Sequence, residues 1–118
     1  MKQNFNFFVS MPPSQRIVEL KEKVSLLPES PGVYQFLGAD GKVIYVGKAK
    51  NLKRRVSSYF TSKANVSPKV RVMVTRIADL RHTVVATENE AFLLENSLIK
   101  SLHPRYNILL KDDKTYPW

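Results

Sequence analysis

A glutamate falls on the apolar face of a strongly patterned segment near the end of the chain. The sequence from Thr87 onward predicts a helix, and Glu95 lies within its apolar arc. Four side chains share that arc: Ala91, Leu94, Leu98 and Leu102. A carboxylate buried without a partner is costly, so Glu95 needs a proton, a basic side chain or a bound cation. The residues alone leave open a metal site and a structural ion pair.

Two tyrosines lie on the paired runs of a predicted β-hairpin. Residues 32–47 hold two runs rich in β-branched and aromatic side chains around Asp40-Gly41, a dipeptide that favours a two-residue type I′ turn. Such a turn places Phe36 opposite Tyr45. Tyr34 and Tyr45 then point to the same face, about 7–8 Å apart. This pair could belong to a site or could simply pack well in strands.

A basic segment follows the hairpin. Residues 48–60 predict a helix with inward apolar side chains at Leu52, Val56 and Phe60. Counting from Lys48, one stripe beside the apolar one holds Asn51, Arg55 and Tyr59. A helix entered through Gly47-Lys48 would gather amides and cationic groups, which suits a phosphate. The other basic side chains are interpreted as solvated charges or phosphate contacts: Lys50, Lys53 and Arg54.

The composition limits what such a site could serve. The chain has 118 residues, enough for one core, and 19 Lys and Arg against 10 Asp and Glu give a net charge of +9. That excess favours a polyanionic partner, either nucleic acid or an acidic membrane surface. The chain has no cysteine, and His82 and His103 lack metal-ligand spacing. A metal would therefore take oxygen ligands, which favours Mg²⁺ or Mn²⁺.

The remaining pattern predicts the elements that would position these residues. A first helix is expected over residues 14–27, and Ser67-Pro68 predicts the start of another. Residues 82–87 predict a short strand, and residues 106–110 are a further possible strand. Thr87 and Glu90 form a capping box for the helix that carries Glu95, and Pro104 ends it.

We expect one domain over residues 14–112. Residues 1–13 are interpreted as a loose arm, and residues 113–118 as the beginning of a following segment. The start of the chain has no apolar stretch long enough for a signal or membrane-spanning segment, which predicts a cytoplasmic protein.

Two short motifs point to a family. The chain reads GVY from Gly32 to Tyr34 and YVG from Tyr45 to Gly47, followed by Arg55 and a glutamate on a later helix. This set resembles the GIY-YIG nuclease superfamily. Within it, LPESPGVYQF, IYVGKAKNLKRRVSSYF and AFLLENSLIKSLHPRYNILLKDDKTYPW resemble the UvrC-type excision nucleases, over about residues 26 to 118. The resemblance implies an α+β fold with a small three-stranded antiparallel sheet flanked by helices.

The resemblance also implies an active site. Its positions match Tyr34, Tyr45, Gly47, Lys48, Arg55, Tyr59, Glu95 and Asn107, with Gly32 as a further motif residue. Glu95 would be the one direct protein ligand of a single Mg²⁺ or Mn²⁺ ion, and Arg55 would support the phosphoryl group. Tyr45 would be the general base with Tyr34 supporting it. Lys48 and the metal would lower the pKa of the phenol from about 10.

The implied activity is incision of DNA on the 3′ side of a lesion during nucleotide excision repair. The implied partners are lesion-containing duplex DNA and a UvrB-type helicase subunit, which would bind segments outside these residues; the isolated domain is expected to be a monomer without a membrane partner. Two alternatives stay open. One is another GIY-YIG endonuclease, of the homing or restriction type, and the other is a non-catalytic basic module that binds nucleic acid.

Overall fold

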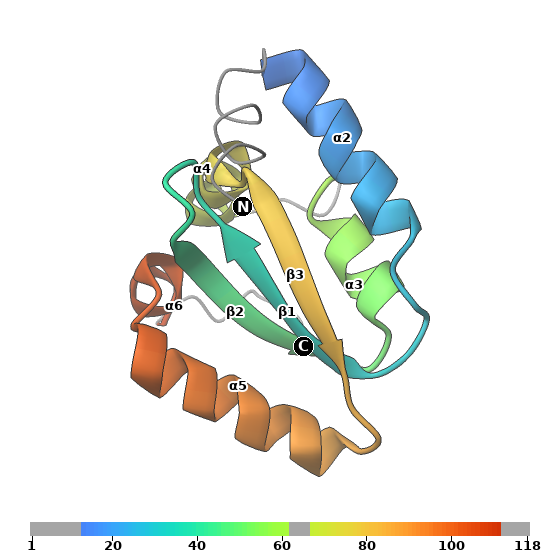
Figure 1. The fold of residues 1–118 in the computed structure, drawn as a ribbon. Coiled ribbons are helices and arrows are strands. Elements are labelled where there is room, and N and C mark those ends of the chain that lie inside the picture. The colour runs from blue at the N-terminus through green and yellow to red at the C-terminus, as the bar shows by residue number, and fades with distance from the viewer. Residues whose placement is uncertain (1–12, 62–66, 112–118) are drawn as a thin grey trace.

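The computed structural model describes residues 13–61 and 67–111. A three-stranded antiparallel sheet has the order β2-β1-β3, with β1 (Gly32–Leu37) between β2 (Val43–Ala49) and β3 (Asp79–Val84) (Figure 1). The predicted α+β fold with a small sheet flanked by helices is confirmed. The expected arm lies almost wholly outside the described residues, as does the expected following segment.

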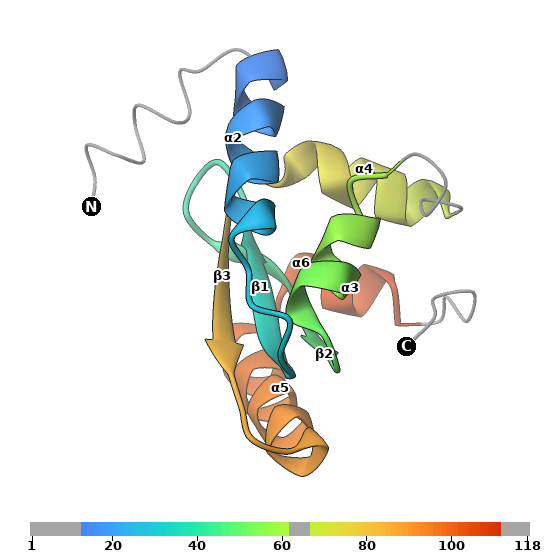
Figure 2. The ribbon, with the colours of Figure 1, turned by 90° about the vertical axis from the view of Figure 1, so that its right-hand side faces the viewer.

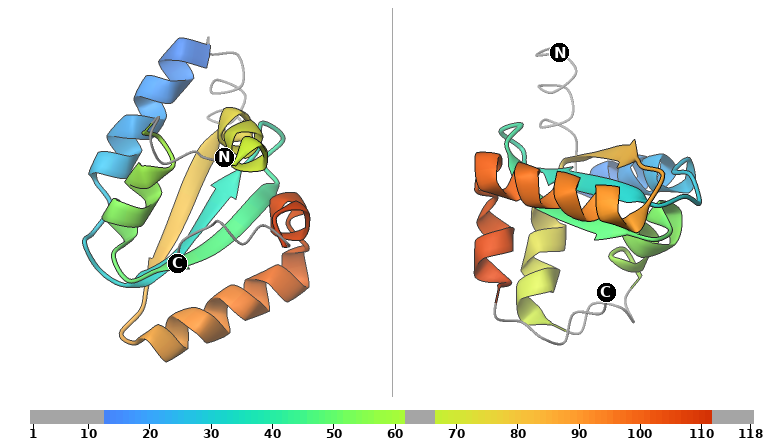
Figure 3. Two further views of the ribbon diagram at one scale, coloured as in Figure 1. Left: turned by 180° about the vertical axis from the view of Figure 1, so that it is seen from behind. Right: turned by 90° about the horizontal axis from the view of Figure 1, so that it is seen from below.

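Five helices in the described ranges surround the sheet: α2 (Pro13–Ser25), α3 (Leu52–Ser58), α4 (Pro68–Arg76), α5 (Glu88–Leu102) and α6 (Arg105–Leu109). Helices α3 and α4 lie on the same side of the sheet (Figure 2). Helix α5 packs against the other face of the sheet, mainly along β2, and α6 lies beside β2 (Figure 3). Among the described residues, no helix has both the length and the apolar character needed to cross a membrane.

Each face of the sheet has its own apolar cluster. The larger cluster joins α2, α3 and α4 to one face and includes Tyr34, Phe36, Tyr45 and Tyr59. The smaller cluster places Val33 and Val46 against Ala91 of α5. Because successive strand residues point to opposite faces, Tyr45 and Gly47 face α3, whereas Val46 and Lys48 face α5.

The β1–β2 hairpin corrects one prediction. The predicted two-residue turn is wrong: Gly38 and Lys42 pair, with a 2.8 Å hydrogen bond from the Gly38 amide to the Lys42 carbonyl, and three residues form the loop. Gly41 has φ 83°, the left-handed conformation that three-residue hairpin loops require. An irregularity between Phe36 and Leu37 then restores the predicted pairing of Phe36 with Tyr45.

The predicted helix over residues 48–60 is shorter than expected. Lys48 and Ala49 belong to β2, and α3 begins at Leu52 because Asn51 caps it, its side chain accepting a 3.0 Å hydrogen bond from the Arg54 amide. Asn51 thus satisfies an amide that has no partner within the helix. Lys48 therefore does not share a helical stripe with Arg55, and α3 does not open at Gly47.

The predicted strand over residues 82–87 begins three residues earlier. Strand β3 pairs with β1 along the whole of β1, from Gly32 opposite Val84 to Leu37 opposite Asp79, so the length of β1 sets its bounds. The possible strand over residues 106–110 is wrong, because this segment lies mostly in helix α6. Its Tyr106 is buried in the larger cluster, which a short helix achieves without strand pairing.

The predicted helix starts are confirmed. Ser67 is the N-cap of α4, with Pro68 at the first helical position. At α5, the Glu90 amide donates to the Thr87 hydroxyl at 3.1 Å, and the Thr87 amide donates to the Glu90 carboxylate at 3.1 Å. This capping box fixes where α5 begins and hence where Glu95 lies on it.

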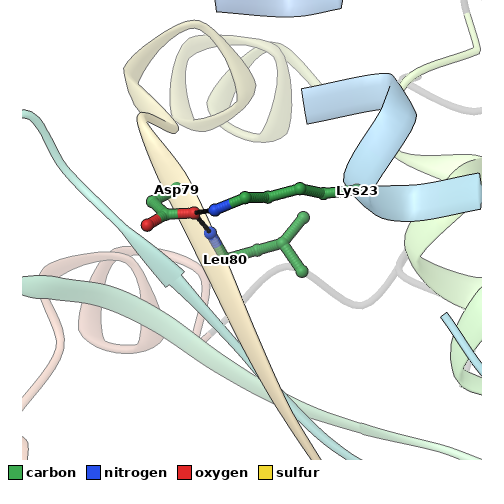
Figure 4. A network of polar contacts seen from close by, with 3 residues as sticks. All are labelled: Lys23, Asp79 and Leu80. Atoms are coloured by element: carbon green, nitrogen blue, oxygen red, sulfur yellow. Dashed lines mark hydrogen bonds and ion pairs between the residues drawn. The ribbon is translucent and has the colours of Figure 1, made fainter. Parts of the chain in front are cut away.

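An ion pair links α2 to the sheet. The Lys23 ammonium contacts the Asp79 carboxylate at the start of β3, and the same oxygen accepts a 2.8 Å hydrogen bond from the Leu80 amide (Figure 4). Both side chains are partly exposed, so the pair contributes at most about 1 kcal/mol. The packing of Leu20 and Val24 into the larger cluster is the stronger attachment of α2.

Candidate active site

Three tyrosines from three elements meet on the α3 side of the sheet. Tyr34 and Tyr45 lie on β1 and β2, and Tyr59 follows α3 as its C-cap residue. The ring centroids of Tyr34 and Tyr45 are 6.3 Å apart, and those of Tyr34 and Tyr59 are 5.9 Å apart. The hydroxyls of Tyr34 and Tyr59 share a buried hydrogen bond of 2.8 Å. The expected shared face is therefore observed, with Tyr59 added to it.

The motif glycines allow this close packing. A Cβ on Gly47 would overlap the ring and hydroxyl of Tyr34, so the backbone of β2 lies directly against that side chain. A Cβ on Gly32 would meet the Thr83 carbonyl and Leu52 in the same way. Glycine at these two positions leaves room for the Tyr34 ring beside β2 and for Leu52 of α3 beside β1, because any larger residue would overlap its neighbours.

Arg55 reaches this cluster from α3. Its guanidinium carbon lies 5.0 Å from the centroid of the Tyr59 ring, and Nη2 is 3.4 Å from the Tyr59 hydroxyl. The stacking fixes the cation beside the tyrosine hydroxyls. Arg55 and Tyr59 are thus brought together as the predicted stripe required.

Glu95 lies on the opposite face of β2. Burial raises the pKa of Glu95 above its ordinary value, while the charge of Lys48 and a hydrogen bond from the Lys48 backbone act to lower it. The Lys48 ammonium lies 5.2 Å from the centroid of the Phe92 ring, one helical turn before Glu95. The carboxylate is therefore half-buried against β2, with a basic side chain beside it.

The tyrosine cluster and Glu95 contact β2 at two successive residues, from opposite faces of the strand. The Tyr34 ring lies against Gly47 on one face, and Glu95 meets the backbone of Lys48 from the other. Strand β2 is at the edge of the sheet, so among the described residues no further strand lies beyond it. Phenol, guanidinium, ammonium and carboxylate groups therefore gather around one short stretch of edge strand.

Asn107 of α6 holds this edge strand. Its Oδ1 accepts a 2.8 Å hydrogen bond from the Val46 amide, and its Nδ2 donates to the Val46 carbonyl at 2.9 Å. The side chain thereby supplies both partners that a neighbouring strand would offer. Asn107 fixes the residue between Tyr45 and Gly47, which is a positioning role.

The residues present suit a hard divalent cation held mainly by water and substrate. Within residues 13–61 and 67–111, no three His, Cys, Asp or Glu side chains lie close enough together to hold a metal. Glu95 offers a single half-buried carboxylate, a ligand type that Mg²⁺ uses while keeping several waters. The donor chemistry thus fits one Mg²⁺ or Mn²⁺ ion.

Residues 30–108 match the family model of the UvrC-like GIY-YIG domain. The chain belongs to the UvrC-like GIY-YIG domain family. The matched range includes every residue of the tyrosine cluster together with Glu95 and Asn107. It also favours the UvrC-type interpretation over a homing or restriction endonuclease.

Curated relatives of this GIY-YIG domain are much longer than the chain. UvrABC system protein C of Flavobacterium psychrophilum is 59% identical over 102 residues, which are 86% of this chain and 17% of that protein. The Bacteroides fragilis protein of the same name is 65% identical over 98 residues, 83% of this chain and 16% of the relative. The chain therefore spans about a sixth of these relatives.

Solved structures agree with the GIY-YIG fold. The N-terminal endonuclease domain of UvrC from Thermotoga maritima, bound to magnesium as its catalytic divalent cation, is 42% identical with a TM-score of 0.68. The match covers 75% of this chain and 96% of that one. Cation-bound variants of the same domain replace three tyrosines and one asparagine. These residue types are the ones that surround β2 here.

The predicted phosphate contacts of the GIY-YIG domain lie around the start of α3. Lys50 is exposed and forms a 3.6 Å ion pair with Glu88 at the start of α5. Lys53 and Arg54 line a surface hollow of about 300 Å³ with Glu29 and Asn51. These cations therefore flank the β2–α3 connection, although they do not join the tyrosine cluster.

One member of the site was missed by sequence reasoning. Phe92 lies beneath the Lys48 ammonium, yet half of its surface is exposed, and helical periodicity gives no reason to single it out. The only signal was its position one turn before Glu95. Lys48 was predicted to lie on a helix, whereas it belongs to β2 and strand alternation directs it toward Phe92 and Glu95.

Proposed function

We propose that the chain is a metal-dependent endodeoxyribonuclease domain that incises DNA on the 3′ side of a lesion during nucleotide excision repair. The observation that carries the proposal is the desolvated Glu95 carboxylate against the Lys48 backbone, on the edge strand whose other face holds Tyr34. A basic chain with a net charge of +9 suits a DNA substrate. Membership of a family whose relatives act as UvrABC system protein C supports this interpretation.

Glu95 is the proposed direct ligand of one Mg²⁺ or Mn²⁺ ion. Such an ion supplies charge stabilisation for the phosphate and for the leaving 3′ oxygen. The neighbouring Lys48 offsets part of the cost of burying the carboxylate when the ion is absent, which helps the domain to stay folded with or without metal. The Thermotoga maritima domain binds magnesium as its catalytic cation, which supports the choice of metal.

The tyrosine cluster is proposed to handle the proton of the attacking water. Tyr45 accepts that proton as the general base, and Tyr34 supports it through the aromatic packing. Tyr59 and Arg55 form a connected pair, in which the guanidinium stabilises charge on the scissile phosphate. Lys48 adds positive charge from the α5 face and favours the phenolate.

DNA is proposed to contact the domain mainly through its phosphates. Lys50, Lys53 and Arg54 lie beside the β2–α3 connection, where they can position the backbone without reading the sequence. Lesion choice and the contact with a UvrB-type helicase subunit would then reside in the rest of the longer protein. We propose that the domain itself is a monomer and acts in the cytoplasm, where bacterial chromosomal DNA lies.

The test combines metal binding with incision. In the domain, Glu95→Gln should abolish Mn²⁺ binding measured by electron paramagnetic resonance, because the one carboxylate ligand is lost. In the full-length protein with its partners and a lesion-bearing duplex, 3′ incision should fall by about a thousandfold or more, since metal assistance contributes several kcal/mol.

Glu88→Gln is the matched control. Glu88 lies on the same helix but is exposed and pairs with Lys50, so its loss should leave Mn²⁺ binding and incision nearly unchanged. Retained 3′ incision in the Glu95→Gln variant would rule out Glu95 as the ligand.

A further inference from the structure

A second concave surface lies behind the tyrosine cluster. It is a groove of about 440 Å³ lined by residues of α2 and α4 and by Tyr59 and Phe60, which follow α3. Residues of both helices line it. Its volume is within the range of typical binding pockets, about 300–1,000 Å³. The proposed nuclease mechanism makes no use of it.

The walls of the groove are apolar. Ile17 and Leu20 contribute from α2, and Val74 from α4 and Ile77 at its C-cap contribute the opposite wall. Ile17 remains 48% exposed, and the adjacent Val18 is 56% exposed, so α2 presents aliphatic surface to solvent at the groove mouth. Exposed aliphatic surface beside a concave site is typical of a protein-binding surface.

The charged side chains that the structure places in the groove lining are basic. Arg16 and Lys21 of α2 line it, and among residues 13–61 and 67–111 no acidic side chain does. The remaining polar lining consists of the hydroxyl-bearing residues Thr61 and Thr75 together with Tyr59. Aliphatic walls with a basic rim complement a peptide that carries both apolar and acidic side chains.

We propose that this groove, here called the α2–α4 groove, binds an acidic amphipathic helix of a protein partner. Aliphatic side chains of that helix enter between Ile17 and Val74, and its carboxylates face Arg16 and Lys21. A nucleic-acid strand is a poorer fit, because Arg16 and Lys21 do not form the row of phosphate contacts that tracks a nucleic-acid backbone.

The groove is also placed to affect the candidate active site. Tyr59 forms part of its lining and shares the 2.8 Å hydrogen bond with the Tyr34 hydroxyl. A helix bound against Tyr59 would therefore contact a residue of the candidate active site. Any link from this contact to incision rests on the proposed nuclease function, whereas the binding step does not.

The binding test uses a fluorescein-labelled helical peptide with leucines at i, i+3, i+4 and i+7 and glutamates on the flanks. Anisotropy should show saturable binding to the 118-residue chain, and amide NMR shifts should cluster at Ile17, Leu20, Val74 and Ile77. A peptide with lysines in place of the glutamates should not bind. Lys21→Glu should weaken binding by about tenfold, since attraction becomes repulsion.

Two variants separate binding from folding. Thr75→Trp places a large ring in the groove from an exposed helix position and should abolish binding while the chain stays folded. Lys100→Glu, the same charge change on exposed α5, should leave binding unchanged. Glu95→Gln should bind the peptide normally, which keeps this result independent of the nuclease proposal.

Several outcomes would overturn the groove proposal. Equal binding of the lysine peptide would show that charge is not recognised, and shifts confined to other surfaces would place the binding elsewhere. Identical shifts from a single-stranded oligonucleotide would assign the groove to nucleic acid. Binding that requires deletion of residues 2–12 would make the chain's own N-terminal segment the occupant.

Discussion

The two faces of the sheet hold reactive groups in different settings. On the α3 face, Tyr34, Tyr45 and Tyr59 are core residues of the larger cluster, each less than a tenth exposed. On the α5 face, Glu95 and Lys48 are partly exposed, and the small cluster there buries Val33, Val46 and Ala91 among the residues that the structure describes. The tyrosine half of the site is therefore part of the main hydrophobic core, whereas the half that holds Glu95 and Lys48 lies near the surface of the domain.

The largest expected effect tests the tyrosine face. Tyr45→Phe should lower incision by about 10²–10⁴-fold, as loss of a general base does, because the ring can no longer accept the proton of the attacking water. Incision should recover in part at higher pH, where hydroxide replaces the base. The measurement is single-turnover 3′ incision as a function of pH.

Tyr34→Phe is the comparison for that variant. It removes the 2.8 Å partner of the buried Tyr59 hydroxyl, so it should destabilise the fold by about 1–3 kcal/mol. A larger loss of incision in Tyr34→Phe, rescued by pH, would exchange the roles of the two tyrosines.

A second prediction tests how far the tyrosine face depends on backbone packing. Gly47→Ala should destabilise the domain by about 1–3 kcal/mol or more, because the added Cβ overlaps the Tyr34 ring, which has no room to move. Gly38→Ala is the control, since its nearest neighbour is the Ile44 Cγ2 at 3.2 Å, the end of a side chain. Urea unfolding of both variants makes the comparison. Equal midpoints would contradict the packing of Tyr34 against Gly47.

The edge strand joins the two faces, and Asn107 tests that junction. Asn107→Ala should destabilise the fold by about 1–3 kcal/mol, because the Val46 amide and carbonyl lose their partners. Hydrogen exchange at the Val46 amide should accelerate more than at amides of β1. Asn96→Ala, on the exposed side of α5, should change neither quantity. Unchanged exchange in Asn107→Ala would mean that water replaces the side chain without loss.

The smallest effect concerns the α5 face without metal. Burial raises the pKa of Glu95 above 4.5, so the folded state holds a proton that the unfolded state releases. The unfolding free energy of the wild type should therefore fall as the pH rises from the ordinary pKa of Glu through the raised one. Glu95→Gln removes this dependence and should be more stable than the wild type near neutral pH in a chelator.

Urea unfolding at about pH 4 and about pH 7 measures the difference. The unfolding free energies of the two proteins should approach each other at the lower pH, where Glu95 is mostly protonated in both states. A difference that grows toward low pH would contradict the direction of the pKa change.

Local sequence signals predicted those parts of the fold that depend on few residues. The capping box of Thr87 and Glu90 fixed the start of α5, and Ser67-Pro68 fixed that of α4. The pairing of Phe36 with Tyr45 was correct for a less direct reason. The loop is one residue longer than predicted, and the irregularity after Phe36 compensates, so the tyrosines still share a face.

The errors arose where tertiary contacts override periodicity. Lys48 continues the helical spacing of Asn51, Arg55 and Tyr59, yet its pairing with Val33 of β1 places it in strand β2. Helix α3 begins only after Asn51, which caps it. Tyr106 to Leu110 has the composition of a strand. In the structure this segment forms most of α6 and lies beside β2, where the Asn107 side chain makes the hydrogen bonds that a neighbouring strand would make.

The candidate site was partly predictable for the same reasons. Glu95 stood out because a carboxylate interrupts an apolar arc, a signal that lies within a single helix. Its position next to the Lys48 backbone could not be predicted, because it depends on how α5 crosses β2. The contact of Phe92 with Lys48 depends on the same crossing.

The amide of Asn107 also bears on how separate copies of the chain behave. Strand β2 is an outer strand, and exposed backbone groups on outer strands recruit strands from other molecules, which leads to aggregation. Because Asn107 occupies both hydrogen-bonding groups of Val46, an incoming strand finds the middle of this edge already taken. Solubility at high concentration is therefore a property to which α6 contributes, separately from any part in cutting DNA.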